Sequence, residues 1–116
     1  MQILVVLFVF SGLLLSVISI PLIQGKVKRN WIYGIRTRRT LSSDDIWFPA
    51  NAYGGRWLFA TGLMIAAVAL ALLLLPGLSL DSYVIGVTAV MLVMLAISIF
   101  MTMRYMQTLG QERRQS

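Results

Sequence analysis

The stretch WLFATGLMIAAVALALLLLPGLSLDSYVIGVTAVMLVMLAISIFMTM, residues 57–103, decides the fold. It holds two uncharged apolar runs, 57–75 and 82–103, and each is long enough to cross about 30 Å of hydrocarbon as a helix. Pro76 and Gly77 lie between the runs, where proline cannot continue a helix and glycine tolerates a turn. The pattern therefore predicts two antiparallel transmembrane helices joined by a short connection.

A third uncharged apolar run covers residues 3–23. No basic segment precedes it, it is longer than the apolar part of a signal peptide, and no A-x-A-like cleavage site follows it. We therefore expect a retained transmembrane helix, which Pro21 kinks or ends near its C-terminal end. The sequence predicts an all-α fold, in which 1–116 form one polytopic membrane domain with three transmembrane helices.

Composition supports this class and excludes others. The 116 residues are 59% hydrophobic and 12% charged, whereas soluble domains are about 25% charged. Cys and His are absent, which removes disulfides, thiolate nucleophiles and the usual zinc ligands. Met91, Met94 and Met101 share one side of the third run, where we expect apolar packing instead of copper binding. We therefore expect no metal and no other cofactor.

The positive charges predict the orientation. All ten Lys and Arg residues lie in the connection 24–56 or after the third run. Because these residues resist translocation, we expect the N-terminus outside and the C-terminus in the cytoplasm, with the connection as a cytoplasmic loop. The net charge of +6 then indicates contact with anionic lipid headgroups and no nucleic-acid partner. Aromatic residues on this side are predicted as interfacial anchors: Trp31, Tyr33, Trp47, Tyr53 and Trp57.

Small residues predict where the helices touch, because helices in lipid associate through close packing of small side chains. One face of the first helix carries three of them, and the second helix carries two pairs spaced by four residues. These predicted contact positions are Gly12, Ser16 and Ser19, then Gly62 with Ala66, and Ala67 with Ala71.

The loop itself shows a helix signal. Ser42 and Asp45 fit a capping box at a helix start. Apolar and aromatic residues then recur at helical spacing, which predicts a short amphipathic helix at the cytoplasmic interface. Pro49 argues against one unbroken helix, and Gly54-Gly55 predicts a bend before the second span. The face in question consists of Ile46, Trp47, Ala50, Tyr53 and Trp57.

Arg36 admits two interpretations, because it follows Gly34 in a tight passage. It either contacts lipid, as we expect of Lys26, Lys28, Arg29, Arg38 and Arg39, or it is held inside and paired with Asp44 or Asp45. Catalysis is not expected. Adjacent carboxylates do not point the same way on a helix, and Ser42 and Ser43 have no His to activate them.

The segment KVKRNWIYGIRTRRTLSSDDIWFPANAYGG, residues 26–55, resembles the signature of the SdpI family in its order K-x-K-x-N, G-I-R-T, T-L-S-S-D, W-x-x-x-N and G-G. The resemblance runs from about residue 21 to 56, and Pro49 departs from it. The family comprises bacterial multi-pass proteins named for immunity to a secreted, sporulation-delaying peptide toxin. Its named member is longer and is also credited with holding a transcriptional repressor at the membrane. Matching positions are Lys28, Asn30, Gly34, Ile35, Arg36, Thr37, Thr40, Leu41, Ser42, Trp47, Asn51 and Gly55.

The resemblance implies a non-enzymatic immunity protein in the cell membrane, whose loop forms a folded cap with Trp47 and Asn51 packed beneath it. Two alternatives stay open: a regulatory module that captures a soluble repressor on its basic cytoplasmic face, and a small oligomeric transporter or lipid- or solute-handling protein. Expected partners are therefore anionic lipid, a peptide toxin, a cytoplasmic repressor or further copies of the chain. The predicted functional residues are Asn30, Gly34, Arg36, Thr37, Thr40, Ser42, Asp44, Asp45, Trp47, Asn51 and Gly55.

Overall fold

Three long helices make up most of the chain. The computed structural model describes residues 2–30, 32–38 and 40–115, with side chains as far as 109, and these residues contain helices and no strand. The long helices are α1 (Gln2–Ile23), α2 (Asp44–Ala71) and α3 (Leu80–Gln115), with short 3-10 helices η1 (Thr40–Ser42) and η2 (Leu72–Leu74). All three long helices are apolar and long enough to cross a membrane. The predicted all-α membrane fold is confirmed.

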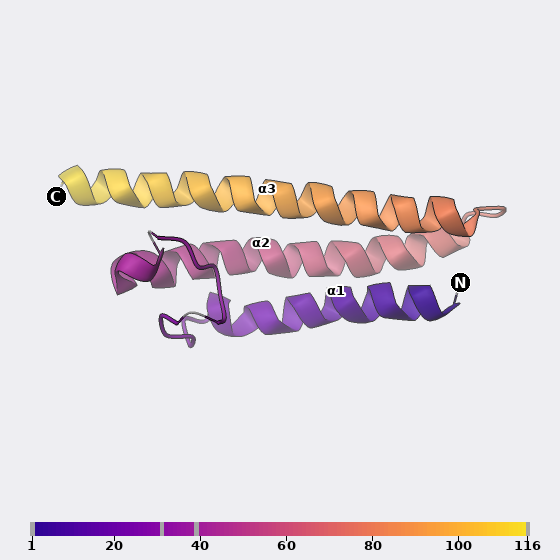
Figure 1. The fold of residues 1–116 in the computed structure, drawn as a ribbon, viewed down its shortest axis with the longest axis horizontal. Helices are drawn as coiled ribbons and strands as arrows, with labels where there is room; N and C mark the ends of the chain where they lie inside the picture. The colour runs from indigo at the N-terminus through magenta and orange to yellow at the C-terminus, as the bar shows by residue number, and fades with distance from the viewer. Residues whose placement is uncertain (1, 31, 39, 116) are drawn as a thin grey trace.

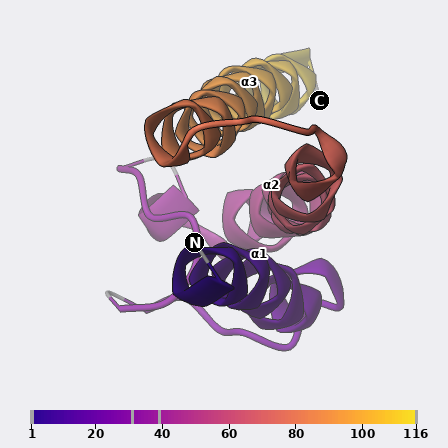
Figure 2. The same ribbon diagram turned by 90° about the vertical axis from the view of Figure 1, so that its right-hand side faces the viewer.

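The helices lie side by side with α2 in the middle (Figure 1). The N-terminus and the α2–α3 connection lie at one end of the bundle, which we call the turn end. The C-terminus and the segment 24–43 lie at the opposite end, which we call the loop end. Viewed along the bundle, segment 24–43 crosses the open side between α1 and α3 (Figure 2). We call this segment the loop.

The seam between α1 and α2 is built from small residues, as predicted. Gly12, Ser16 and Gly62 are all buried. A Cβ added to Gly12 or Gly62 would overlap the other glycine's carbonyl oxygen, so the two backbones approach as closely as they can. Ser16 Oγ donates to the Phe59 carbonyl oxygen at 2.8 Å, which ties the helices together by a hydrogen bond.

The second predicted pair on α2 is wrong. Ala67 and Ala71 are exposed, whereas Ala66 and Ala69 are buried. A spacing of four residues places two side chains on one face of a helix, but it does not say which face meets a neighbour. The face with Ala67 and Ala71 points away from the packed seams.

The turn end holds the main apolar core, where all three helices meet. Val5, Ile65 and Val87 belong to its buried cluster. Tyr83 is fully buried, donates its hydroxyl to the Ala69 carbonyl oxygen at 2.8 Å, and meets Phe8 edge to face. Along the α2–α3 seam, the hydroxyls of Thr61 and Ser98 lie 3.0 Å apart. The polar atoms buried between these helices are therefore satisfied within the protein.

The separate interfacial helix and the bend are also wrong. Pro49, Gly54 and Gly55 all lie inside α2, which runs as one helix from the loop into the second span. The N-cap is Ser43, with extended backbone and no capping hydrogen bond from its side chain, and Ser42 instead ends η1. Pro21 was also predicted to kink or end a helix, and α1 continues past it as far as Ile23.

Candidate functional site

The loop begins at a helix end that turns the chain back. Gly25 has φ +70°, a conformation that favours glycine. The Lys26 N–H donates to the Pro21 carbonyl oxygen at 3.0 Å, and the Gly25 N–H donates to that of Leu22 at 3.3 Å. This pair of hydrogen bonds is the Schellman motif. It ends α1 and directs the loop toward the start of α2.

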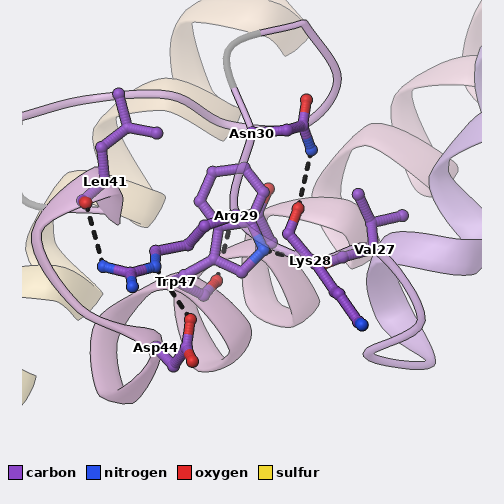
Figure 3. Close-up of polar contacts among 8 residues, drawn as sticks. Val27, Lys28, Arg29, Asn30, Leu41, Asp44 and Trp47 are labelled. Atoms are coloured by element: carbon purple, nitrogen blue, oxygen red, sulfur yellow. Dashed lines mark hydrogen bonds and ion pairs between the residues drawn. The ribbon is translucent and has the colours of Figure 1, made fainter.

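Trp47 anchors the first part of the loop. Its side chain is fully buried, and its indole Nε1 donates to the Val27 carbonyl oxygen at 2.7 Å (Figure 3). Trp47 therefore packs under the protein's own loop, and its predicted place as an interfacial anchor is wrong. A tryptophan ring needs apolar contacts and one acceptor for its N–H group. A folded loop can supply both as well as a membrane interface can.

Asn30 organises the next turn. Its Oδ1 accepts hydrogen bonds from the backbone N–H groups of Ile32 at 2.8 Å and Tyr33 at 2.6 Å. Its Nδ2 donates to the Lys28 carbonyl oxygen at 2.7 Å, as Figure 3 shows. Asparagine commonly builds such turns because its side chain mimics a backbone peptide. The hydroxyl of Tyr33 then donates to the Ile18 carbonyl oxygen, so this turn is held against α1.

Asn51 holds the centre of the loop from below. It is 2% exposed, and its Oδ1 accepts from the Ile35 N–H at 2.6 Å. Its Nδ2 donates to the carbonyl oxygens of Trp47 at 2.9 Å and Ile35 at 3.4 Å. One amide side chain thus serves both backbone groups of Ile35. Gly34, at φ +112°, lies directly above, where an added Cβ would be 2.8 Å from Asn51 Oδ1.

The glycine pair of α2 serves close packing. A Cβ on Gly54 would overlap the Ile35 side chain and lie 3.1 Å from Thr102 Oγ1 of α3. A Cβ on Gly55 would lie 3.0 Å from Ile23 of α1. Neighbouring residues on a helix point about 100° apart, so the pair admits the loop on one side and α1 on the other. Two adjacent glycines in an otherwise helical pattern are the sequence signal for this close packing. From the sequence alone they are interpreted as a bend.

Two threonines close the last turn of the loop. The Thr37 N–H donates to Thr40 Oγ1 at 2.7 Å, and the Thr40 N–H donates to Thr37 Oγ1 at 3.2 Å. Thr40 is fully buried, and its hydroxyl donates to the Thr37 carbonyl oxygen at 3.1 Å. This reciprocal arrangement starts η1 and satisfies the polar groups of a turn that could not otherwise be buried.

The remaining predicted residues lie on the surface. Arg36, Ser42, Asp44 and Asp45 are exposed, so the expectation that Arg36 is held inside is wrong. The ion pair of Asp44 is made with Arg29, whose Nε lies 2.9 Å from Asp44 Oδ1 (Figure 3). Pairing of Arg36 with Asp45 stays a prediction.

Arg29 also donates from Nη1 to the Leu41 carbonyl oxygen at 3.2 Å, and so links the first part of the loop to η1. Sequence reasoning missed this residue, because it assigned Arg29 to lipid headgroups. The side chains of Arg29 and Asp44 are 40% and 62% exposed, so we expect the pair to add less than about 1 kcal/mol of stability.

The predicted residues therefore divide into a framework and a surface. The framework consists of seven of them, whose side chains or missing side chains hold the loop in place: Asn30, Gly34, Thr37, Thr40, Trp47, Asn51 and Gly55. The surface consists of Arg36, Ser42, Asp44 and Asp45. Within the part of the chain that the structure describes, no cluster of three His, Cys, Asp or Glu residues could hold a metal. What the arrangement offers is a polar surface with charges of both signs on a firmly packed base.

A helical membrane protein with a folded polar loop at one end is the class that this architecture defines. The chain belongs to the SdpI/YfhL protein family, whose sequence model matches residues 26–103. It is 42% identical over 43 residues to a protein of Bacillus subtilis (strain 168) named uncharacterized protein YfhL. That match covers 37% of this chain and 39% of the relative, so it spans well under half of either. No solved structure matches the chain.

Proposed function

We propose that this protein is a non-enzymatic immunity protein of the SdpI type, which protects a bacterial cell membrane against a membrane-active peptide toxin. Family membership supports the type of protein. The observation that carries the proposal is the division of the loop into framework and surface. The framework orders the segment without a bound partner, so the surface residues are presented for recognition at little further cost in conformational entropy.

The loop surface has the chemistry to bind a peptide. Arg36, Arg38 and Ser42 are exposed on it, and Asp45 is exposed in the first turn of α2, which follows the loop. Guanidinium groups bind carboxylates through paired hydrogen bonds, and hydroxyl and carboxylate oxygens accept from peptide N–H groups. In this proposal the loop lies in the cytoplasm and binds the toxin where it emerges from the bilayer. No catalytic step is needed, and a chain without Cys or His offers few groups for one.

The test is a survival assay. The wild-type protein and an Arg36→Gln variant are expressed in a bacterium sensitive to the sporulation-delaying peptide toxin, and the minimum inhibitory concentration of the toxin is measured. We expect the wild type to raise this concentration and Arg36→Gln to remove most of the gain. Quantitative blotting of the membrane fraction establishes that both proteins are present in equal amounts.

Arg56→Gln is the matched control, because Arg56 is an exposed arginine of α2 outside the loop. It loses the same charge and should keep protection. Equal protection by wild type, Arg36→Gln and an Arg38→Gln variant would exclude the loop surface as the functional site. Absence of protection by the wild type, at normal membrane levels, would exclude the immunity function itself.

A further inference from the structure

An apolar groove lies between α2 and α3, directly beneath the loop. Its volume is about 180 Å³. The loop contributes Ile35 and Arg36 to its lining, α2 contributes Leu58, and α3 contributes Ile99 and Met103. The groove is open on one side, and Ile99 and Met103 are 62% and 44% exposed. It is therefore accessible from the surface that the bundle presents to lipid.

The deep wall of the groove favours a hydrocarbon occupant. Ser98 and Thr102 lie on this wall, but their hydroxyls already donate to the carbonyl oxygens of Met94 and Ser98, each at 2.7 Å. Ser98 Oγ also lies 3.0 Å from Thr61 Oγ1. Since these groups are satisfied by the protein, a polar ligand would gain little from them and would lose its own hydration. An alkyl chain would bury apolar surface against the hydrophobic side chains.

The mouth of the groove is basic. A second depression shares Arg36 and Thr37 with the groove and adds Arg38 and Ser42. Both arginines are exposed. Two guanidinium groups and neighbouring hydroxyls form a donor set that suits a phosphate, which arginine binds through paired hydrogen bonds. The site thus changes from apolar to basic over a short distance.

The position along α3 matches the depth of a lipid. The uncharged part of α3 ends at Arg104, and Ser98 precedes it by six residues, or about 9 Å at 1.5 Å per residue. With Arg104 at the level of the headgroups, the groove extends from that level into the upper acyl region. A phosphate at the mouth would therefore lie at its normal depth in a bilayer.

We propose that the groove and its basic mouth together bind an anionic phospholipid, with the phosphate at Arg36 and Arg38 and the first part of an acyl chain between Leu58, Ile99 and Met103. Charge selects the headgroup, and the groove selects a ligand that also carries a chain. The proposal goes beyond the immunity function and does not depend on it, because it concerns a ligand of the resting protein in its membrane.

The experiment uses the full chain in nanodiscs of phosphatidylcholine with a small fraction of phosphatidylglycerol that carries a photoreactive group in its acyl chain. Cross-linked residues are mapped by mass spectrometry. We expect cross-links at Ile99 and Met103, reduced by unlabelled phosphatidylglycerol but not by added phosphatidylcholine or glycerol phosphate. Arg36→Gln and Arg38→Gln should each weaken apparent binding about fivefold, and Arg56→Gln should change it less.

A second variant keeps the test independent of loop folding. Ile99→Trp fills the groove from an exposed position and should abolish these cross-links, while Val93→Trp, at another exposed position of α3, should leave them. Cross-links spread evenly over the lipid-facing residues, with no headgroup preference, would overturn the proposal. Equal losses in Arg36→Gln and Arg56→Gln, or competition by glycerol phosphate alone, would also overturn it.

Discussion

Asn51 shows how one side chain can hold a loop segment in a fixed conformation. A buried backbone N–H or C=O needs a partner, and both backbone groups of Ile35 find theirs in a side chain of α2. The amide of Asn51 has the same donor and acceptor as a peptide group, so it serves both backbone groups of Ile35. Its Nδ2 also donates to the Trp47 carbonyl oxygen within α2. No apolar residue of similar size can do this.

We therefore predict that Asn51→Leu loosens the loop while the helices persist. The substitution leaves the backbone groups of Ile35 without their partner, at a cost of about 1–3 kcal/mol. Hydrogen exchange in detergent micelles should show the Ile35 amide exchanging about ten times faster or more, with little change in α1 and α3. Gln107→Leu, an exposed position on α3, is the control. Unchanged exchange at Ile35 in the Asn51 variant would contradict this role.

At this scale the sequence identified important positions better than their roles. Trp47 and Asn51 stood out through the family resemblance, and both lie at the centre of the site. Periodicity could not show that Trp47 meets Val27, because an amphipathic face looks the same whether it is covered by lipid or by a loop twenty residues away. Arg29 was missed for a similar reason, since nothing local distinguishes a lysine or arginine that pairs from one that contacts headgroups.

At the scale of elements, α2 determines the architecture because both other helices pack on it. Sequence rules predicted a break in this helix. Pro49 does remove one backbone donor, and the two glycines lower helix propensity. These local penalties are overcome because Ile46, Trp47 and Ala50 are buried, and because Gly54 and Gly55 permit close contacts with the loop and α1. Tertiary packing of this kind cannot be read from a single segment.

The close approach of α1 and α2 predicts that the same glycine-to-alanine change has different effects on stability at two positions. Gly62→Ala places a methyl group against the Gly12 carbonyl oxygen and Ser16, so we expect a loss of about 1–3 kcal/mol in the free energy of unfolding. Gly86→Ala makes the same chemical change in α3, where the nearest atom is the end of the Leu72 side chain at 3.1 Å. It should be neutral or slightly stabilising.

Unfolding by SDS titration in mixed micelles, followed by circular dichroism, measures both variants. The comparison removes the general effect of adding a methyl group to a helix. Equal stability of the two variants would show that the close approach at Gly62 contributes nothing particular. The small-residue pattern predicted this seam correctly, but it predicted Ala67 and Ala71 equally, because spacing alone does not identify the face that meets a neighbour.

At the scale of the whole molecule, charge is distributed between the two ends of the bundle. Every lysine and arginine lies in the loop, at the loop end of α2, or at Arg104 and beyond on α3, whereas the turn end carries Asp81. From this asymmetry we expect the basic end to lie in the cytoplasm. Each apolar run falls mainly on one long helix, although α2 already begins at Asp44 and α3 continues to Gln115. The fold class, but not the helix bounds, could therefore be predicted from composition and run length.

This distribution predicts a topology that labelling can check. The chain has no cysteine, so single cysteines can be introduced at exposed positions of each end, with Asp81→Cys at the turn end and Gln107→Cys at the loop end. In spheroplasts, a membrane-impermeant maleimide should label Asp81→Cys at once and Gln107→Cys only after lysis. A permeant maleimide, which should label both, is the control. The reverse pattern would place the loop outside the cell and contradict the proposed site of toxin binding.

The contact between the loop and α3 has a consequence for biosynthesis. Gly54 meets Thr102, Thr37 lies 4.0 Å from the sulfur of Met106, and Met106 also packs under the first turns of α2. The ribosome makes these α3 residues after it has made the loop. The loop therefore cannot complete its packing until the third helix has entered the bilayer. A chain truncated before α3 would insert two helices and leave the packing of the loop incomplete, so an ordered loop indicates that α3 is in place.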